Sequence, residues 1–327
     1  MYNMTSEIKI QRIILIAVLV TLLKSVSVSC TRRPIIGVLA QEFSVINGTE
    51  AVKGRTGKSS YIAASYIKAV ESSGARTIPI FVNRNRNYYE RILYSINGVV
   101  IPGGDSQLKP GYPYYDAFTT IIEISEEMNK KGIYFPILAV CLGFEAFVVL
   151  YNGHKDPQTT CKIHQENYPL KFEPKFTESL LFANMDHQTY INLKYFPVTI
   201  NNHFWCTTQK NFTKSRKLSK NWKITSTGVS SRGLKFIATI EHKEHPFIGV
   251  QFHPEKAIFE WKEELNLPHS EAAIQANRYF YDVLVKLSKL NSNKFATHED
   301  ERNALIYNYK PRYQEEYSVF VQIYVFE

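Results

Sequence analysis

The residues best suited to chemistry surround Cys141. This cysteine lies between an apolar run, Phe135 to Val140, and a segment whose apolar residues follow helical spacing. The run predicts a buried parallel strand and the segment a helix, so the chain must turn sharply at Cys141. On such a turn the helix N-terminus lowers the thiol pKa, and nearby backbone N–H groups face the atom that the sulfur attacks. Cys141 is therefore a candidate nucleophile; the alternative is a small buried apolar residue.

Two other segments carry the groups that a cysteine nucleophile needs. Gly103 and Gly104 follow an apolar run, and paired glycines let backbone N–H groups approach a ligand closely. Together with the N–H of Leu142, they form a candidate oxyanion hole. His253 and Glu255 follow another apolar run, and on an extended strand they share a face. That spacing suits a carboxylate that orients a general base.

Strands and helices that alternate along the chain must position these groups. This alternation predicts a parallel sheet with right-handed crossovers. Residues 41–60 and 105–115 are expected to be loops near the site, and the pattern over 152–195 is irregular. The expected strands are 35–40, 77–82, 98–101, 135–140, 196–200, 222–226, 235–241, 247–252 and 317–326. The expected helices are 61–73, 88–96, 142–151, a segment from about 118 to 132, and a long helix capped by Ser270.

The order of these motifs resembles the class I glutamine amidotransferase superfamily and, more closely, the gamma-glutamyl hydrolase family. The resemblance extends from Arg33 to Glu327, and one departure is Ala139, where the superfamily usually has glycine. The segments that carry it are Arg33 to Gly37, Tyr61 to Tyr66, Pro102-Gly103-Gly104, Cys141 to Glu145, Asn202 to Trp205, His253 to Ala257 and Ala304 to Tyr307.

The resemblance implies an α/β fold of the flavodoxin-like type, in which helices flank a mostly parallel central sheet and an additional antiparallel strand region is present. It implies a single catalytic domain over residues 30–327. Its implied activity is cysteine-dependent cleavage of gamma-glutamyl amide bonds in poly-gamma-glutamate conjugates such as folates, through a thioester. The implied catalytic residues are Cys141, His253 and Glu255, and the implied substrate-binding residues are Tyr61, His203 and Glu145.

Two other functions fit the same motifs. A glutaminase module that releases ammonia from glutamine uses the same turn, and a catalytically inactive binding protein could share the scaffold. No cofactor is expected. No metal site is expected either, because His154, Cys161, His164 and His187 lack closely paired ligand spacing. His203 beside aromatic residues would, without the resemblance, be interpreted as a packed core residue.

Residues 1–29 have the pattern of a secretory signal peptide. Lys9 and Arg12 precede an apolar stretch from Ile13 to Leu23, which is short for a membrane span, and small residues follow. The alternative is a retained membrane anchor. We expect a secreted or lysosomal protein, without stable membrane association after cleavage, glycosylated at Asn47 and Asn211. The four cysteines do not fix a disulfide connectivity.

The net charge of +9 is spread along the chain. Nucleic-acid-binding segments are usually denser in basic residues, so a nucleic-acid partner is not expected. A mildly basic surface would attract a polyanion such as a glutamate chain. The expected partner is thus a small-molecule substrate. A homodimer is compatible with these features, and the sequence does not determine the oligomeric state.

Overall fold

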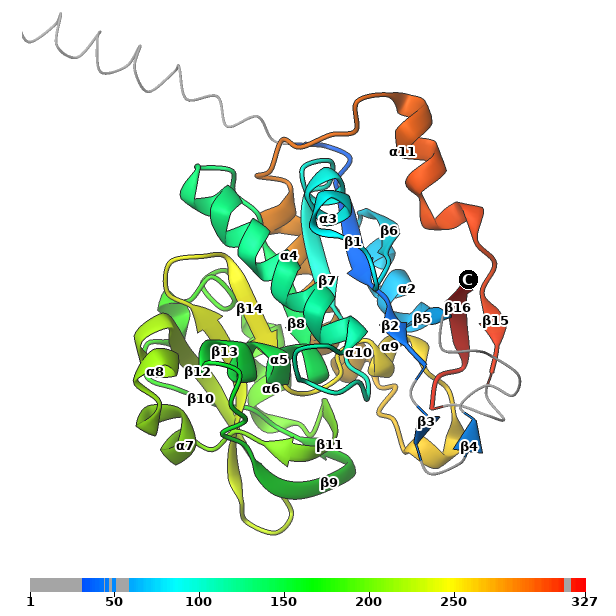
Figure 1. Ribbon diagram of the computed structural model, residues 1–327. Helices are drawn as coiled ribbons and strands as arrows, with labels where there is room; N and C mark the ends of the chain where they lie inside the picture. The colour runs from blue at the N-terminus through cyan, green and yellow to red at the C-terminus, as the bar shows by residue number, and fades with distance from the viewer. Residues whose placement is uncertain (1–30, 44, 47–48, 51–58, 315–318) are drawn as a thin grey trace, which may run out of the picture. The chain divides into compact units, whose positions relative to one another are not determined.

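The computed structural model describes residues 31–43, 45–46, 49–50, 59–314 and 319–327. The segment from Thr31 to Glu327 forms one compact unit, shown in Figure 1. The predicted signal peptide and Asn47 lie outside the described residues. Within those residues, no helix combines the length and the apolar character of a membrane span.

An eight-stranded sheet forms the centre of this unit, in the order β10-β12-β13-β14-β8-β7-β1-β6. The five strands from β14 to β6 run parallel, whereas β10, β12 and β13 add an antiparallel edge. The mostly parallel sheet with an antiparallel addition confirms the predicted fold class. The strands of this sheet are β1 Ile35–Leu39, β6 Arg76–Ile80, β7 Gly98–Ile101, β8 Ile137–Val140, β10 Lys171–Phe172, β12 Trp222–Val229, β13 Lys235–His242 and β14 Phe247–Val250.

Helices cover both faces of the sheet. Along β1, Ile36 and Val38 pack into one apolar cluster with α2 and α10, while Ile35 and Leu39 pack into a second cluster with α3, α4 and α5. This alternation is what a strand buried on both faces requires. The helices are α2 Ala64–Ser72, α3 Arg86–Leu93, α4 Pro113–Lys130, α5 Leu142–Tyr151, α6 His187–Tyr195, α7 Gln209–Lys214, α8 Arg216–Asn221, α9 Lys256–Phe259, α10 Glu271–Ser288 and α11 His298–Ala304, with 3-10 turns at Phe176–Glu178, Glu263–Leu265 and Ile306–Asn308.

Smaller antiparallel sheets lie beside the central one. Two long strands, β9 Thr159–Tyr168 and β11 Thr199–Cys206, pair with each other. A four-stranded sheet contains the C-terminal strand β16, which lies within the strand expected over 317–326 and pairs with β5. The remaining strands are β2 Gln41–Glu42, β3 Val45–Ile46, β4 Thr49–Glu50, β5 Ser60–Ala63, β15 Arg312–Tyr313 and β16 Gln322–Phe326.

Several regions differ from the expected pattern. Residues 41–60, expected to be a loop, contain the short strands β2, β3 and β4, because β2 pairs with β5 and β3 with β4. Residues 60–63 form β5 instead of the start of a helix, because they pair with β16 at the far end of the chain. The irregular region 152–195 contains β9, whose alternation is broken at Lys162 and Gln165, two residues with positive φ. Residues 298–304, for which no element was expected, form α11, which the Thr297 side chain caps.

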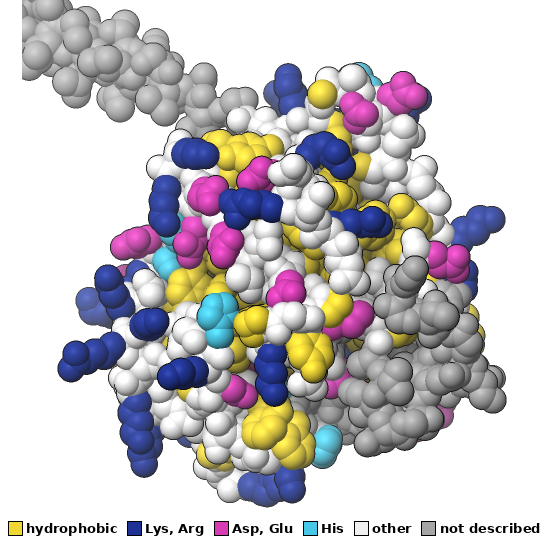
Figure 2. Space-filling model, in the orientation of Figure 1, with side chains coloured by type: hydrophobic (Ala, Val, Ile, Leu, Met, Phe, Trp, Pro, Cys, Tyr) yellow, Lys and Arg dark blue, Asp and Glu magenta, His cyan; other side chains and the backbone are white. Residues whose placement is uncertain are grey.

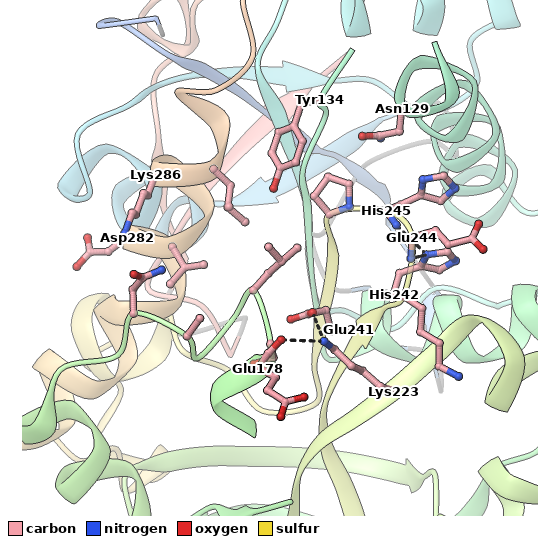
Figure 3. A pocket seen from close by; sticks show the side chains of 18 of the residues that line it. Asn129, Tyr134, Glu178, Lys223, Glu241, His242, Glu244, His245, Asp282 and Lys286 are labelled. Atoms are coloured by element: carbon pink, nitrogen blue, oxygen red, sulfur yellow. Dashed lines mark hydrogen bonds and ion pairs between the residues drawn. The ribbon is translucent and has the colours of Figure 1, made fainter. Parts of the chain in front are cut away.

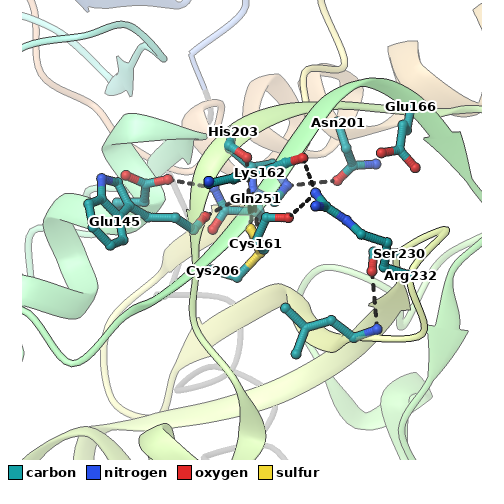
Figure 4. Close-up of a disulfide and its surroundings, with 12 residues drawn as sticks. Glu145, Cys161, Lys162, Glu166, Asn201, His203, Cys206, Ser230, Arg232 and Gln251 are labelled. Carbon is teal, nitrogen blue, oxygen red and sulfur yellow. Dashed lines mark hydrogen bonds between the residues drawn. A yellow bond between two sulfur atoms is a disulfide. The ribbon is translucent and has the colours of Figure 1, made fainter.

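A disulfide between Cys161 and Cys206 joins β9 to β11 (Figure 4). The two cysteines are 45 residues apart in the sequence and almost fully buried. The strand pairing is irregular between Asn201 and His203 and again between His203 and Trp205. The disulfide therefore holds the two strands together beside the part of the ladder where regular pairing fails.

We predict that replacing both Cys161 and Cys206 by serine lowers the free energy of unfolding by about 2–4 kcal/mol, because the unfolded chain regains the freedom that the cross-link removes. Urea unfolding monitored by circular dichroism measures this change. A thiol reductant should lower the stability of the wild type toward that of the double variant and leave the variant unchanged. Equal stability of the two proteins under oxidising conditions would contradict the prediction.

Candidate active site

Three adjacent parallel strands deliver the predicted catalytic residues to one edge of the sheet. Cys141 follows β8 directly, Gly103 follows β7 after one residue, and His253 follows β14 after two. In the sheet order, β8 lies between β14 and β7, so the cysteine stands between the histidine and the glycine turn. The carboxyl ends of parallel strands are where open α/β sheets bind ligands.

Cys141 lies on the sharp strand-to-helix turn that the sequence predicted. Its φ of 50° and ψ of −103° place a non-glycine residue in a sparsely populated backbone conformation. The turn is tight because a methyl group at Gly143 would come within 2.5 Å of the Ile101 carbonyl oxygen. The same hypothetical methyl group would lie 3.2 Å from the Ala139 side chain, so the missing side chain at Gly143 leaves room for alanine at 139.

His253 and Glu255 form a buried pair. His253 Nδ1 lies 2.8 Å from Glu255 Oε1, and both side chains are almost fully buried. Burial, followed by the positive charge of Lys256, lowers the pKa of His253, and the Glu255 carboxylate opposes that change. The imidazole is therefore neutral near pH 7. The short contact assigns its proton to Nδ1, which leaves Nε2 as the basic atom.

The thiol pKa differs from the sequence-based expectation. Burial, followed by the charge of Glu145, raises the pKa of Cys141 well above its usual value. The N–H of Leu142 lowers it, as a helix N-terminus should, but this effect is smaller. The resting group is consequently a neutral thiol, and a base must remove its proton when it reacts.

The Gly103-Gly104 turn packs directly against Cys141 and His253. A methyl group at Gly103 would lie 2.7 Å from His253 Cε1 and 3.0 Å from Cys141 Cβ. The Gly103 N–H donates a hydrogen bond of 2.9 Å to the Tyr66 hydroxyl oxygen. The sequence analysis expected this N–H to be an oxyanion donor. In the structure it is already bonded to Tyr66, so it is not available for that role.

All three predicted substrate-binding residues reach the same cavity as the catalytic residues. Tyr61, Glu145 and His203 line a cavity of about 710 Å³ together with Cys141 and His253. Its wall combines loops after the parallel strands with the paired strands β9 and β11 and the C-terminal segment. The other lining residues are Gly104 to Lys109, Leu142, Val149, Asp156, Gln158, His164, Asn202, Phe204, Trp205, Lys256, Val319 and Phe320.

Glu145 is a buried carboxyl group in this wall. Its Oε1 accepts a hydrogen bond of 3.0 Å from Gln251 Nε2, and both residues appear near the disulfide in Figure 4. Burial raises the pKa of Glu145 to about 8, with Gln251 acting in the opposite direction. At neutral pH the group is mostly protonated and can donate a hydrogen bond into the cavity.

His203 packs against the disulfide. Its Nδ1 lies 2.9 Å from the Trp205 carbonyl oxygen and 3.5 Å from each sulfur, and its Nε2 lies 3.3 Å from Asn201 Oδ1. Figure 4 shows the ring beside Cys161 and Cys206. Burial lowers the pKa of His203 to about 4, so its imidazole is neutral near pH 7.

A second cavity, of about 780 Å³, is lined partly by residues before β8 and β14, at the opposite end of the central strands (Figure 3). Lys223 lies there between Glu241, at 2.8 Å, and the Glu178 carbonyl oxygen, at 3.4 Å. Ser179 also lines this cavity. Its hydroxyl donates to the Phe176 carbonyl oxygen and accepts from the Phe182 N–H. The groups suited to nucleophilic chemistry are therefore in the Cys141 cavity.

Two clusters of described residues have the composition of metal sites, and some of their donor atoms are engaged in other bonds. Cys161 and Cys206, beside His203, share their disulfide bond. In the other cluster, formed by Glu126, His242 and His245, His242 Nδ1 accepts backbone N–H bonds of 3.1 Å from residues 244 and 245. Glu126 also accepts a hydrogen bond from the Tyr151 hydroxyl. The first cluster therefore cannot bind a metal while its disulfide is intact, whereas in the second His245 Nδ1 has no hydrogen-bond partner among the described residues.

The surface bears on two predictions: the spread of basic charge and the glycosylation of Asn211. On the face shown in Figure 2, Lys and Arg side chains are scattered among acidic ones, in keeping with a solvated surface. Asn211 lies in the short helix α7 and not in a loop, and its side-chain amide donates to the Pro157 carbonyl oxygen at 2.8 Å. Attachment of a glycan would replace one of the two hydrogens on this amide nitrogen.

The sequence analysis missed four residues that contact the site: Gln41, Tyr66, Gln251 and Lys256. Each stands next to or within a motif that was recognised, but its contact partner is distant in the sequence. Gln41 and Tyr66, for example, bond to the glycine turn more than 30 residues away. Tyr66 fell on the apolar stripe of a helix, which indicated burial and gave no sign of what its hydroxyl would meet.

We predict that Glu145→Gln changes how stability depends on pH. Because the pKa of Glu145 in the folded protein is above its ordinary value of 4.5, the folded state binds this proton more tightly than the unfolded state. The contribution to stability is full below about pH 4.5 and is lost as the pH rises to about 8. Chemical denaturation at pH 5 and pH 8 should show a smaller loss of stability in the variant than in the wild type; equal losses would contradict this.

Comparison with known proteins places this geometry in a family. Residues 34–255 match the family model described as Peptidase C26. The chain is 34% identical over 296 residues to the gamma-glutamyl hydrolase of Homo sapiens, covering 90% of both chains. It is 32% identical to gamma-glutamyl hydrolase B of Dictyostelium discoideum, covering 90% of this chain and 83% of that one.

A plant relative and a solved structure extend the comparison. Gamma-glutamyl hydrolase 1 of Arabidopsis thaliana is 30% identical, covering 86% of this chain and 79% of that one. A glutamine amido transferase from Methylobacillus flagellatus is 10% identical with a TM-score of 0.36, covering 82% and 99%, a likeness too low to establish fold or function. The family match and the extended identity agree with each other: the chain belongs to the gamma-glutamyl hydrolase family, Peptidase C26.

Proposed function

We propose that this chain is a cysteine hydrolase that cleaves gamma-glutamyl amide bonds of poly-gamma-glutamate conjugates. The observation that carries the proposal is the placement of Cys141, on a strained turn, in one cavity with the buried His253–Glu255 pair. Membership of the gamma-glutamyl hydrolase family supports the bond type. The conjugate, such as a folate, is inferred from the family resemblance alone.

The reaction begins with proton transfer. His253 is neutral and takes the proton of the Cys141 thiol, while Glu255 stabilises the imidazolium that forms. The sulfur then attacks the amide carbon. The developing oxyanion is met by the N–H groups of Leu142 and Gly104, each contributing about 3–4 kcal/mol when well aimed. His253 returns the proton to the departing amine, and water hydrolyses the resulting thioester.

The cavity wall offers partners for the rest of the substrate. Glu145, mostly protonated at neutral pH, can donate to a free carboxylate of the glutamyl unit. Lys109 and Lys256 also line the cavity and bring positive charge to it. We propose that these lysines form charge-assisted hydrogen bonds with further carboxylates of the poly-gamma-glutamate substrate. Tyr61 and His203 complete the wall around the scissile bond.

Two other functions make use of the same scaffold. A glutaminase would use the same turn and base but release ammonia from free glutamine. An inactive binding protein would be favoured if the nucleophile, the base or its carboxylate partner were missing or separated. The presence of all three, with a 2.8 Å contact within the histidine–glutamate pair, supports an enzyme.

We further propose that the chain is exported to a secreted or lysosomal location and acts without a stable membrane association. The supporting observations are the signal-like pattern of residues 1–29 and the disulfide, since disulfides persist mainly in oxidising compartments. Asn47 and Asn211 remain proposed glycosylation sites.

Cys141→Ala and His253→Ala should each lower kcat by roughly four orders of magnitude, because nucleophile and base act in the same step. Steady-state kinetics on a gamma-linked glutamate oligomer measure the loss, with circular dichroism to verify folding. His298→Ala, in helix α11 and outside the cavity lining, serves as the control and should behave like the wild type. Substantial turnover by folded Cys141→Ala would exclude the proposed nucleophile.

Substrate choice tests the proposed bond type. The wild type should hydrolyse gamma-linked glutamyl chains and show negligible cleavage of α-linked ones, because the wrong linkage leaves buried polar groups unpaired. Free glutamine should release little ammonia, since it lacks the rest of the chain that provides binding energy. Product analysis by mass spectrometry at equal substrate concentrations compares the three. Preferential ammonia release would indicate a glutaminase, and no turnover of any substrate a binding protein.

A further inference from the structure

The backbone of Gly103 is held by a buried side chain at each of its two polar groups. Its carbonyl oxygen accepts a hydrogen bond of 2.8 Å from Gln41 Nε2, and its N–H donates one of 2.9 Å to the Tyr66 hydroxyl. The two side chains come from different elements, β2 and α2, and are 2% and 0% exposed. Neither contact belongs to the pairing of a sheet or helix.

The bond from Gln41 fixes which way the next amide points. A trans peptide is planar, so the carbonyl of Gly103 and the N–H of Gly104 point in opposite directions. The carbonyl points at Gln41, and the Gly104 N–H therefore points away from Gln41. Gly104 lines the cavity together with Cys141 and Leu142. Its N–H is the donor that the proposed mechanism pairs with the N–H of Leu142.

This orientation needs a constraint because two consecutive glycines have wide backbone freedom. If the Gly103–Gly104 peptide rotated by half a turn, a carbonyl oxygen would replace the N–H that faces the reacting carbon. The developing oxyanion would then meet a negative partial charge instead of a donor. A bond to the Gly103 carbonyl prevents that rotation, and a bond to its N–H anchors the preceding peptide.

The glycines are needed so that these side chains can reach the backbone. A methyl group at Gly104 would lie 1.7 Å from Gln41 Oε1, and one at Gly103 would lie 2.9 Å from the Tyr66 oxygen. Neither glycine has positive φ, so their role is to provide space and not an unusual backbone conformation. The turn and the two side chains fit together as one unit.

Tyr66 also reaches the general base. Its hydroxyl oxygen lies 3.4 Å from His253 Nδ1, on the side where Glu255 binds. Burial raises the pKa of Tyr66 well above its usual value, so the group remains a neutral phenol. The same hydroxyl thus contacts the oxyanion turn and the histidine that transfers the proton.

We propose that Gln41 and Tyr66 are positioning residues that hold the Gly103–Gly104 peptide with its N–H toward Cys141, so that the oxyanion donor is formed before substrate binds. The inference rests on the proposed hydrolase function. Gln41 acts by fixing the Gly103 carbonyl, and Tyr66 by anchoring the Gly103 N–H beside His253.

Three substitutions separate this role from general packing. Gln41→Met keeps the length of the side chain and removes its donor. Gln41→Glu keeps its shape and places a titratable group against the Gly103 carbonyl. Tyr66→Phe removes the hydroxyl, and Tyr89→Phe is its matched control, since the buried Tyr89 donates its hydroxyl to the Phe81 carbonyl oxygen at 3.1 Å and lies outside the cavity lining.

We expect Gln41→Met and Tyr66→Phe to lower kcat by about 10- to 100-fold with KM within about twofold, a loss smaller than that for removing a donor outright. Tyr89→Phe should match the wild type. In Gln41→Glu, a protonated carboxyl can donate to the carbonyl and an ionised one repels it. Its kcat relative to the wild type should therefore fall as the pH rises through the pKa of the new carboxyl group.

Two further measurements separate the oxyanion donor from the thiol. Alkylation of Cys141 by iodoacetamide needs no oxyanion hole and should stay within about twofold of the wild-type rate. Binding of a gamma-glutamyl aldehyde, whose adduct with a thiol carries an oxygen in the oxyanion position, should weaken by about the same factor as kcat. The alkylation rate also verifies that each variant keeps a folded site.

Unchanged kcat and aldehyde affinity in Gln41→Met and Tyr66→Phe would overturn the inference. A parallel loss of alkylation rate would also overturn it, because the damage would then lie at the thiol. Equal effects of Tyr66→Phe and Tyr89→Phe would show that the Tyr66 hydroxyl contributes only to packing. If the wild type fails to hydrolyse gamma-linked substrates, the proposed function is wrong, while the aldehyde comparison still decides the role of Gln41.

Discussion

The strained backbone of Cys141 is the constraint on which the site depends. A non-glycine residue with a φ of 50° costs of order 1–3 kcal/mol, and it persists only where the surroundings enforce it. Here β8 is buried between two parallel neighbours, and α5 starts at the very next residue. The Cys141 N–H is bonded to the Val250 carbonyl at 2.8 Å, which ties the turn to the strand that leads to His253. The close approach at Gly143 then fixes the helix against β7.

Burial sets the protonation states around that turn. The thiol of Cys141 and the carboxyl of Glu145 have raised pKa values, and the imidazole of His253 has a lowered one, because low-dielectric surroundings disfavour every isolated charge. The two groups that exchange the proton, the Cys141 thiol and the His253 imidazole, are therefore both neutral at rest. Proton transfer from sulfur to nitrogen creates a charge pair inside the cavity, where the nearby carboxylate and backbone N–H groups stabilise it.

The central sheet and the paired strands β9 and β11 contribute different parts of the cavity. Parallel strands supply the nucleophile, the base and the oxyanion turn at fixed register, since their ends are held by neighbouring strands on both sides. The β9–β11 strand pair supplies His203 and the exposed aromatic residues Phe204 and Trp205 from a ladder with irregular pairing. The disulfide and the Arg232 side chain, which donates to the Cys161 carbonyl at 2.7 Å, hold this wall in place of regular strand pairing.

The sequence by itself determined the order of the parallel strands' motifs, the turn at Cys141 and the pairing of His253 with Glu255. These depend on local features: apolar runs, glycine positions and a two-residue spacing along one strand. Only the tertiary structure decided what those groups meet. The pKa of Cys141 depends on burial and on Glu145, the disulfide on strands far apart in the chain, and the Gly103 hydrogen bonds on Gln41 and Tyr66. Hydrogen bonds and burial link residues that are distant in sequence, and residue spacing carries no record of such contacts.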